Sequence, residues 1–153
     1  MKIFNSKIID VTYGSNCKVI EPANMYGCIL GDNVFVGPFV EVQKGVKIGD
    51  NTKIQSHSFV CELVTIGSNC FIGHGVMFVN DKFTNGGPAQ GDSTLWLKTN
   101  IDDNVSIGSN ATVLPVYICS NVVIGAGSVV TKDIVIPGTY VGNPATLLEN
   151  KHD

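Results

Sequence analysis

The chain has 153 residues, of which 44% are hydrophobic and 15% are charged, a composition that fits one compact domain. Its net charge of −3 comes from scattered Lys, Asp and Glu residues with no basic run, so nucleic acid is not an expected partner. The start lacks an apolar segment typical of a signal peptide, and no window approaches the roughly 18 apolar residues of a membrane span, so we expect a cytoplasmic protein with no membrane partner.

A repeat of six residues runs through most of the chain and is weak only before Leu30. An aliphatic or aromatic residue begins each hexad, and a second residue, often small or β-branched, follows four positions later. The first series is Leu30, Val36, Val42, Ile48, Ile54, Val60, Ile66, Ile72 and Phe78, then Ile101, Ile107, Val113, Ile118, Ile124, Val130 and Ile136. The second is Val34, Val40, Val46, Thr52, Ser58, Val64, Cys70 and Val76, then Val105, Ala111, Val122, Ser128 and Ile134.

This pattern predicts an all-β fold made of short strands and turns, with both series pointing inward. Three hexads make one triangular coil of a parallel β-helix, so that residues 18 positions apart stack on one another. The spacing slips by one residue near Pro115 and Val116, which indicates a deletion in a turn. Periodicity alone does not give the hand of the helix, and a right-handed β-helix or a β-sandwich is the structural alternative.

We expect one domain over residues 1–153, with one external loop and one closing segment. The loop spans about residues 79–100, which are polar, rich in glycine and without the period; long insertions of this kind are usually functional. The segment 142–153 is expected to cover the open end. The five cysteines are odd in number and form no CxxC pair, which favours reduced thiols, with Cys70 in the core.

Two segments resemble a known family. Ile124–Ala145, IGAGSVVTKDIVIPGTYVGNPA, resembles the closing coil of hexapeptide-repeat acyltransferases. Val34–Phe83 is similar to the nucleotide-sugar N-acetyltransferases, which acetylate amino groups on dideoxy-amino-hexoses linked to a nucleoside diphosphate. The resemblance extends from about Val19 over nearly the whole chain. It implies a left-handed parallel β-helix, a homotrimer with active sites between neighbouring subunits, acetyl-CoA as co-substrate and a small-molecule acceptor.

The resemblance also implies site residues. The family carries a His in a hexad like IQSH and an Asn-Asp pair after an aliphatic-Phe strand, matched here by His57 and by Asn80 with Asp81. The pair is expected to hold the acceptor. The family continues with an aromatic residue and Pro-Arg, whereas this chain reads Lys82-Phe83-Thr84-Asn85, so a charge partner for a diphosphate or carboxylate is missing there.

Acetyl transfer to an amine needs a proton acceptor and hydrogen-bond donors for the oxyanion. His57 is the candidate base, because imidazole titrates near neutrality. Gly75 lies three hexads after His57 and is expected to stack on it, where the Gly75 backbone N–H could face the thioester carbonyl. Coenzyme A is expected to contact Ser109, Ala126 and Lys132, and no metal is expected.

Structural interpretations exist for several of these residues. His57, Asn80 and Asp81 could be ordinary turn residues, and His74 is interpreted as a structural turn residue. Trp96 is expected to anchor the returning loop by burying its ring.

Two other functions are possible for such a fold. In γ-type carbonic anhydrases three His residues bind zinc between subunits; His57 and His74 are 17 positions apart and could be neighbours, but Ser68 and Gly73 occupy the places where a third ligand is expected, and His152 lies in the tail. A non-catalytic scaffold would be a regular stack without the insertion at 79–100.

Overall fold

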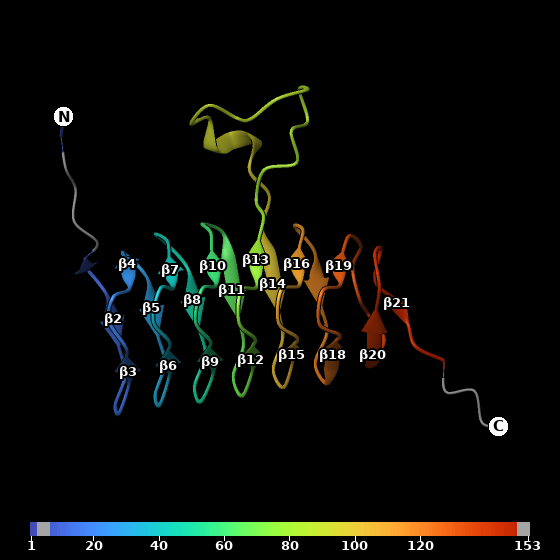
Figure 1. The fold of residues 1–153 in the computed structure, drawn as a ribbon, viewed down its shortest axis with the longest axis horizontal. Coiled ribbons are helices and arrows are strands. Elements are labelled where there is room, and N and C mark those ends of the chain that lie inside the picture. The colour runs from blue at the N-terminus through green and yellow to red at the C-terminus, as the bar shows by residue number, and fades with distance from the viewer. Residues whose placement is uncertain (3–6, 150–153) are drawn as a thin grey trace.

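The computed structural model describes residues 1–2 and 7–149, and in it the chain winds repeatedly through three parallel sheets (Figure 1). Sheet A has the order β1 (Ile8–Ile9), β4 (Asn24–Tyr26), β7 (Glu41–Val42), β10 (Phe59–Val60), β13 (Met77–Phe78), β16 (Thr112–Val113) and β19 (Val129–Val130). Sheet B has the order β17 (Tyr117–Ile118), β14 (Thr99–Ile101), β11 (Val64–Ile66), β8 (Lys47–Ile48), β5 (Ile29–Leu30) and β2 (Thr12–Tyr13). Sheet C has the order β21 (Thr146–Leu147), β20 (Gly138–Val141), β18 (Val122–Ile124), β15 (Ser106–Ile107), β12 (Phe71–Ile72), β9 (Lys53–Ile54), β6 (Phe35–Val36) and β3 (Lys18–Val19).

The strand register confirms the repeat. Phe59 pairs with Met77, its equivalent three hexads further along the chain, so three hexads make one coil as predicted. Ile101 pairs with Ile118, which is one position short of that spacing and confirms the deletion in the intervening turn. The fold is the expected left-handed parallel β-helix. It begins earlier than the weak repeat before Leu30 suggests, because β1 to β4 already pair with strands of the next coil.

The interior contains both inward series, stacked as ladders. Every residue of the second series is buried, including Cys70, and so is every residue of the first series except Ile136. The expectation for Ile136 is wrong: its side chain is 60% exposed. The last coil is shorter, since Ile118 forms a bridge with Ile134, and Ile134 therefore takes the inward place.

The external loop leaves the coil after β13 and returns at β14, and it projects away from the stack (Figure 1). It contains one short 3₁₀ helix, η1 (Ser93–Leu95), which Asp92 caps by accepting the Thr94 backbone N–H at 3.0 Å. The predicted boundary at 100 is slightly late, because Thr99 and Asn100 already belong to β14. At the C-terminal end β21 folds back antiparallel to β20. No helix in the described ranges is long and apolar enough to cross a membrane.

Each coil has three corners, which we name by their most informative residues. The asparagine corner joins sheet B to sheet C and comprises 14–17, 31–34, 49–52, 67–70, 102–105 and 119–121. The histidine corner joins sheet C to sheet A and comprises 37–40, 55–58, 73–76, 108–111 and 125–128. The loop corner joins sheet A to sheet B and comprises 43–46, 61–63, the external loop 79–98, 114–116 and 131–133.

Candidate functional site

The residue types at positive φ differ between the corners. Turns that need a positive φ favour Gly or Asn, since other side chains meet the backbone there. The asparagine corner obeys this on every coil, with Asn16, Asn33, Asn51, Asn69, Asn104 and Asn121 at φ of 57° to 63°. The histidine corner instead has Phe39 (φ 60°), His57 (φ 64°), Gly75 (φ 66°), Asn110 (φ 60°) and Gly127 (φ 69°). Phe39 is a bulky residue that is unfavourable at such a turn, and together with His57 it distinguishes this corner from the asparagine corner, which points to a functional surface.

His57 and Phe39 occupy the same place on successive coils, and their rings stack. The ring centroids lie 4.9 Å apart with an interplanar angle of 28°. Both side chains are exposed, and the His57 N–H donates to the Pro38 carbonyl oxygen at 3.2 Å. The stack fixes the plane of the imidazole while leaving the ring accessible, as a base that must reach a substrate requires. Phe39 is a functional candidate that sequence reasoning missed.

His74 lies one coil further along the same corner and is held by a hydrogen bond. Its Nδ1 lies 2.8 Å from Ser56 Oγ, which leaves Nε2 of the exposed ring free of this contact. A hydroxyl that donates to Nδ1 fixes the tautomer with the proton on Nε2, a hydrogen-bond donor. The structural interpretation of His74 is therefore incomplete. The spacing of three hexads between Ser56 and His74 is the sequence signal that could have paired them.

Gly75 follows His57 on the next coil, as the spacing predicts. Its backbone N–H, however, donates to the Ser56 carbonyl oxygen at 2.9 Å, within the ladder that joins successive coils. The expectation of a free oxyanion donor at this N–H is thus not met. A side chain at this position would be strained by the positive φ of 66°, and its Cβ would lie 2.5 Å from Asn110 Oδ1, so the Asn110 side chain would have to shift.

The residues expected to contact coenzyme A fall into two groups. Ser109 and Ala126 lie on the histidine corner, one and two coils beyond His74, and the Gly127 N–H donates to the Ser109 carbonyl oxygen at 2.9 Å. Lys132 is exposed and lies on the loop corner, after β19. One chain therefore places the candidate base, Ser109 and Ala126 along one edge of the helix, and Lys132 along another.

Asn80 and Asp81 form the neck of the external loop. Asn80 Nδ2 donates to the Glu62 carbonyl oxygen at 3.2 Å, and the Asn80 carbonyl oxygen accepts the Leu97 N–H at 2.8 Å. The Asp81 carboxylate accepts the N–H of Phe83 at 2.9 Å and that of Ala89 at 2.7 Å. Both residues thus shape the loop. Trp96 lies where the loop returns and is half-buried, so the expected burial of its ring is only partial.

A pocket of about 400 Å³ lies at the base of this loop, lined by Val79, Asp81, Lys82, Phe83 and Leu114. It places Asp81 beside a mainly apolar hollow between the loop and the next coil. This is the part of the loop corner that could receive the acyl or acceptor portion of a substrate.

The two groups of site residues lie at opposite ends of the sheet A strands. His57 precedes β10, whereas Asn80 follows β13, the strand paired with β10. One side of the coil separates them, roughly 15 Å at about 3.3 Å per residue. Within one chain His57 therefore does not lie close to the Asn80-Asp81 turn, although the two are expected to serve the same reaction. This separation could have been predicted from the sequence. Residues share a corner when whole coils of three hexads lie between them, and His57 and Asn80 do not have such a spacing.

A metal centre finds no support in the described part of the chain. No group of three or more His, Cys, Asp or Glu side chains that could hold a metal ion occurs among residues 1–2 and 7–149. His57 and His74 lie on neighbouring coils of one corner, as the γ-carbonic anhydrase hypothesis needs, but His152 lies outside the described residues.

Comparisons with known proteins agree with the repeat. Residues 27–62 match the family model for bacterial transferase hexapeptide (six repeats), and residues 63–77 and 98–132 match that for the hexapeptide repeat of succinyl-transferase. Among curated relatives, the bifunctional protein GlmU of Acetivibrio thermocellus is 32% identical over 136 residues, which cover 88% of this chain and 27% of that protein. The chain spans between 20% and 30% of the length of the curated relatives it matches.

Solved structures share the fold. A hexapeptide-repeat acetyltransferase from Vibrio cholerae, in complex with acetyl-coenzyme A, is 29% identical, with a TM-score of 0.68 over 83% of this chain and 72% of that one. AntD, an N-acyltransferase from Bacillus cereus solved with dTDP and coenzyme A, is 22% identical, with a TM-score of 0.78 over 90% of this chain and 82% of that one. The coils and the matched repeats together show that the chain belongs to the hexapeptide-repeat transferases.

Proposed function

We propose that this protein transfers an acetyl group from acetyl-CoA to the amine of a small, sugar-like acceptor. The observation that carries the proposal is the histidine corner, where His57 and His74 replace or flank the usual turn residues and lie in line with Ser109 and Ala126. Acetyl-CoA and coenzyme A are bound by solved relatives of the same fold, which supports the choice of co-substrate.

The chemistry assigns a separate role to each histidine. The acceptor amine must attack the thioester carbonyl as a neutral nucleophile and lose one proton. The C–S bond breaks, and the thiolate leaves with the electron pair of that bond. His57, oriented by Phe39, takes the proton and passes it to the departing sulfur. His74 Nε2–H, oriented by Ser56, donates to the carbonyl oxygen as negative charge develops there, the role that the Gly75 N–H cannot fill while bonded to Ser56.

The acceptor is held by the loop corner of a second copy of the chain. Since the histidine corner and the Asn80-Asp81 neck lie at opposite ends of sheet A, a closed ring of three copies can bring the neck of one subunit to the histidines of the next. Outward apolar side chains support such packing: Phe71 is 41% exposed and Val123 is 46% exposed, both on sheet C. A homotrimer is therefore part of the proposal.

The direct test is acetyl transfer by the purified protein. Saturating acetyl-CoA should raise the melting temperature, and free coenzyme A should be released only when an amino sugar is added. The acetylated product should resist alkaline hydroxylamine, which cleaves acetyl esters but not amides, and zinc or chelators should change neither rate nor stability. An unmoved melting temperature together with no coenzyme A release over a panel of amino sugars would refute the proposal.

A further inference from the structure

Both ends of the external loop are attached to one turn of the preceding coil. This turn comprises Cys61, Glu62 and Leu63 and lies between β10 and β11. Where the loop leaves the stack, the Glu62 carbonyl oxygen accepts a hydrogen bond from Asn80 Nδ2 at 3.2 Å. Where the chain returns to the stack, the Leu63 carbonyl oxygen accepts the Thr99 N–H at 3.1 Å. The geometry of the turn therefore sets the position of the loop neck.

The turn is held in a conformation that its sequence does not favour. Leu63 has a φ of 69° and occupies the place that Gly45, with a φ of 77°, occupies on the preceding coil. A bulky side chain is unfavourable at a positive φ. The Leu63 side chain is 42% exposed, so burial in the core does not explain its presence. Contacts made by neighbouring groups must hold the turn.

A glutamine on the preceding coil makes such a contact. Gln43 Oε1 accepts the Glu62 N–H at 3.2 Å, and Gln43 Nε2 donates to Glu41 Oε1 at 2.9 Å. The Tyr26 hydroxyl, one coil earlier, donates to the same carboxylate oxygen at 3.4 Å. Burial, and then the negative charge of Glu41, raise the pKa of Tyr26, which keeps its hydroxyl a donor. All four residues are half-buried, so water competes less for these bonds.

The chemical nature of these groups allows one direction for the chain of hydrogen bonds. An ionised carboxylate only accepts, so the end of Gln43 that faces Glu41 is its NH₂ group. The backbone N–H of Glu62 only donates, so it requires the oxygen at the other end of the Gln43 amide. The backbone carbonyl of Glu62 only accepts, so the Asn80 NH₂ group must face it. Asn80 Oδ1 is then the end of that amide that remains for a substrate.

We propose that Glu41 and Gln43 are positioning residues, which act through the Glu62 peptide and orient the Asn80 amide so that its Oδ1 accepts a hydrogen bond from the acceptor substrate. The group of the acceptor that meets Asn80 is then a hydrogen-bond donor, an amine N–H or a hydroxyl, and not a carbonyl or carboxylate oxygen. An amide held in one orientation also loses less conformational freedom when the substrate binds. The inference rests on the proposed function for the role of Asn80, whereas the orientation of its side chain can be measured without any acetyl transfer.

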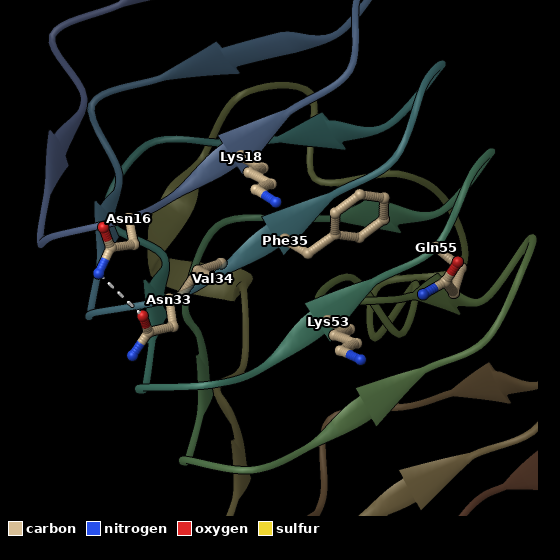
Figure 2. Close-up of a pocket in the computed structure, with 7 residues that line it drawn as sticks. All are labelled: Asn16, Lys18, Asn33, Val34, Phe35, Lys53 and Gln55. Carbon is tan, nitrogen blue, oxygen red and sulfur yellow. Dashed lines mark hydrogen bonds between the residues drawn. The ribbon is translucent and has the colours of Figure 1, made fainter.

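Gln55 provides a matched control. It is half-buried and follows β9 directly, as Gln43 follows β7, but it lies on sheet C instead of sheet A. Figure 2 shows it at the border of a pocket of about 540 Å³ that Lys18, Phe35 and Lys53 also line, with no hydrogen bond drawn between its amide and these residues. Gln55→Leu therefore removes a glutamine amide from an equivalent place without altering the chain that leads to the loop.

The test is nuclear magnetic resonance of the intact protein with isotope-labelled asparagine, in which the Asn80→Ala variant identifies the Asn80 side-chain signal. Gln43→Leu should shift that signal and quicken the exchange of its Nδ2 protons with water about fivefold, the effect of one ordinary hydrogen bond. It should also lower kcat/KM about tenfold for the amino sugar that wild-type protein acetylates fastest, and leave the KM for acetyl-CoA unchanged. Gln55→Leu should leave the Asn80 signal as in the wild type.

An exchange of the two side chains separates the hydrogen bonds from packing. Gln43→Glu places a second carboxylate beside Glu41 and should disturb Asn80 at least as much as Gln43→Leu. Adding Glu41→Gln again sets an NH₂ group opposite a carboxylate, and the carboxylate at position 43 still accepts the Glu62 N–H. The double variant should therefore return both the Asn80 signal and kcat/KM to within about twofold of the wild-type values.

Three outcomes would overturn the inference: the Asn80 signal is unchanged in Gln43→Leu, kcat/KM is unchanged although the signal responds, or the double variant behaves no better than Gln43→Glu alone. Circular dichroism of each variant verifies the fold. Any of these results, with acetyl transfer by the wild-type protein intact, refutes the positioning role alone. The predicted response of the Asn80 signal, with no acetyl transfer by the wild-type protein to any amino sugar, refutes the proposed function instead.

Discussion

The imidazole of His57 stacks on the phenyl ring of Phe39, 4.9 Å away, and both residues lie at a positive φ on successive coils. The equivalent place at the asparagine corner always holds Asn, which tolerates this conformation at less cost than Phe, a difference of about 1 kcal/mol. Phe39→Asn should therefore raise the melting temperature or leave it unchanged, while kcat falls several-fold because the ring of His57 loses its partner. Thermal unfolding and steady-state kinetics check this, and a less stable variant with unchanged kcat would contradict it.

The Ser56–His74 hydrogen bond predicts a second effect at the same corner. Ser56→Ala removes the group that orients the imidazole at 2.8 Å, and should lower kcat about tenfold with little change in the KM for acetyl-CoA. Ser56→Thr keeps the hydroxyl and should recover most of the rate. Equal losses in the Ala and Thr variants would show that packing, and not the hydrogen bond, matters at this position.

The loop neck predicts a change in dynamics without loss of the fold. Asp81→Ala removes the acceptor of the Phe83 and Ala89 N–H groups, so hydrogen exchange should quicken between residues 82 and 92 and the KM for the acceptor should rise. The melting temperature should change little, because the stacked coils are untouched. Asp92→Ala, which removes only the cap of η1, is the control and should quicken exchange near that helix alone. Unchanged exchange in Asp81→Ala would contradict this assignment.

The six-residue period predicted the coils, the buried ladders and the inserted loop, because inward residues must be either apolar or small on every side of the triangle. It failed at Ile136, where the last coil shortens and Ile134 takes the inward place. The site was harder to predict. Motif matches identified His57 and Asn80 as site residues but did not place them at different corners of the coil. The spacing of three hexads per coil contained that information. Phe39 stands at a turn place typical of Asn or Gly and was a usable signal. The pocket lined by Lys18, Phe35 and Lys53 depends on the orientation of outward-facing side chains, which the six-residue period does not determine.

Because two thiols are buried, we expect the protein to become less stable at alkaline pH. Burial raises the pKa of Cys61 to about 12 and that of Cys28 to about 11, from an ordinary value of 9.0. Above pH 9 the unfolded chain loses these protons while the folded chain keeps them, so stability should fall as pH rises from 9 towards 11 to 12. The Cys28→Ala/Cys61→Ala variant, although less stable at neutral pH, should show a flatter decline. A decline as steep as that of the wild type would exclude these thiols as its cause.

The measurement that tests the shared site most directly is complementation between two inactive variants. His57→Ala should lower kcat by about 10²-fold and Asn80→Ala should impair acceptor binding and rate, so each homotrimer alone should be nearly inactive. If the histidines of one subunit act with the loop neck of the next, trimers co-assembled from both variants contain some intact sites. Random mixing in equal amounts then restores about a quarter of wild-type activity. Activity in verified mixed trimers that stays at the level of the separate variants would contradict a site completed by a second copy of the chain.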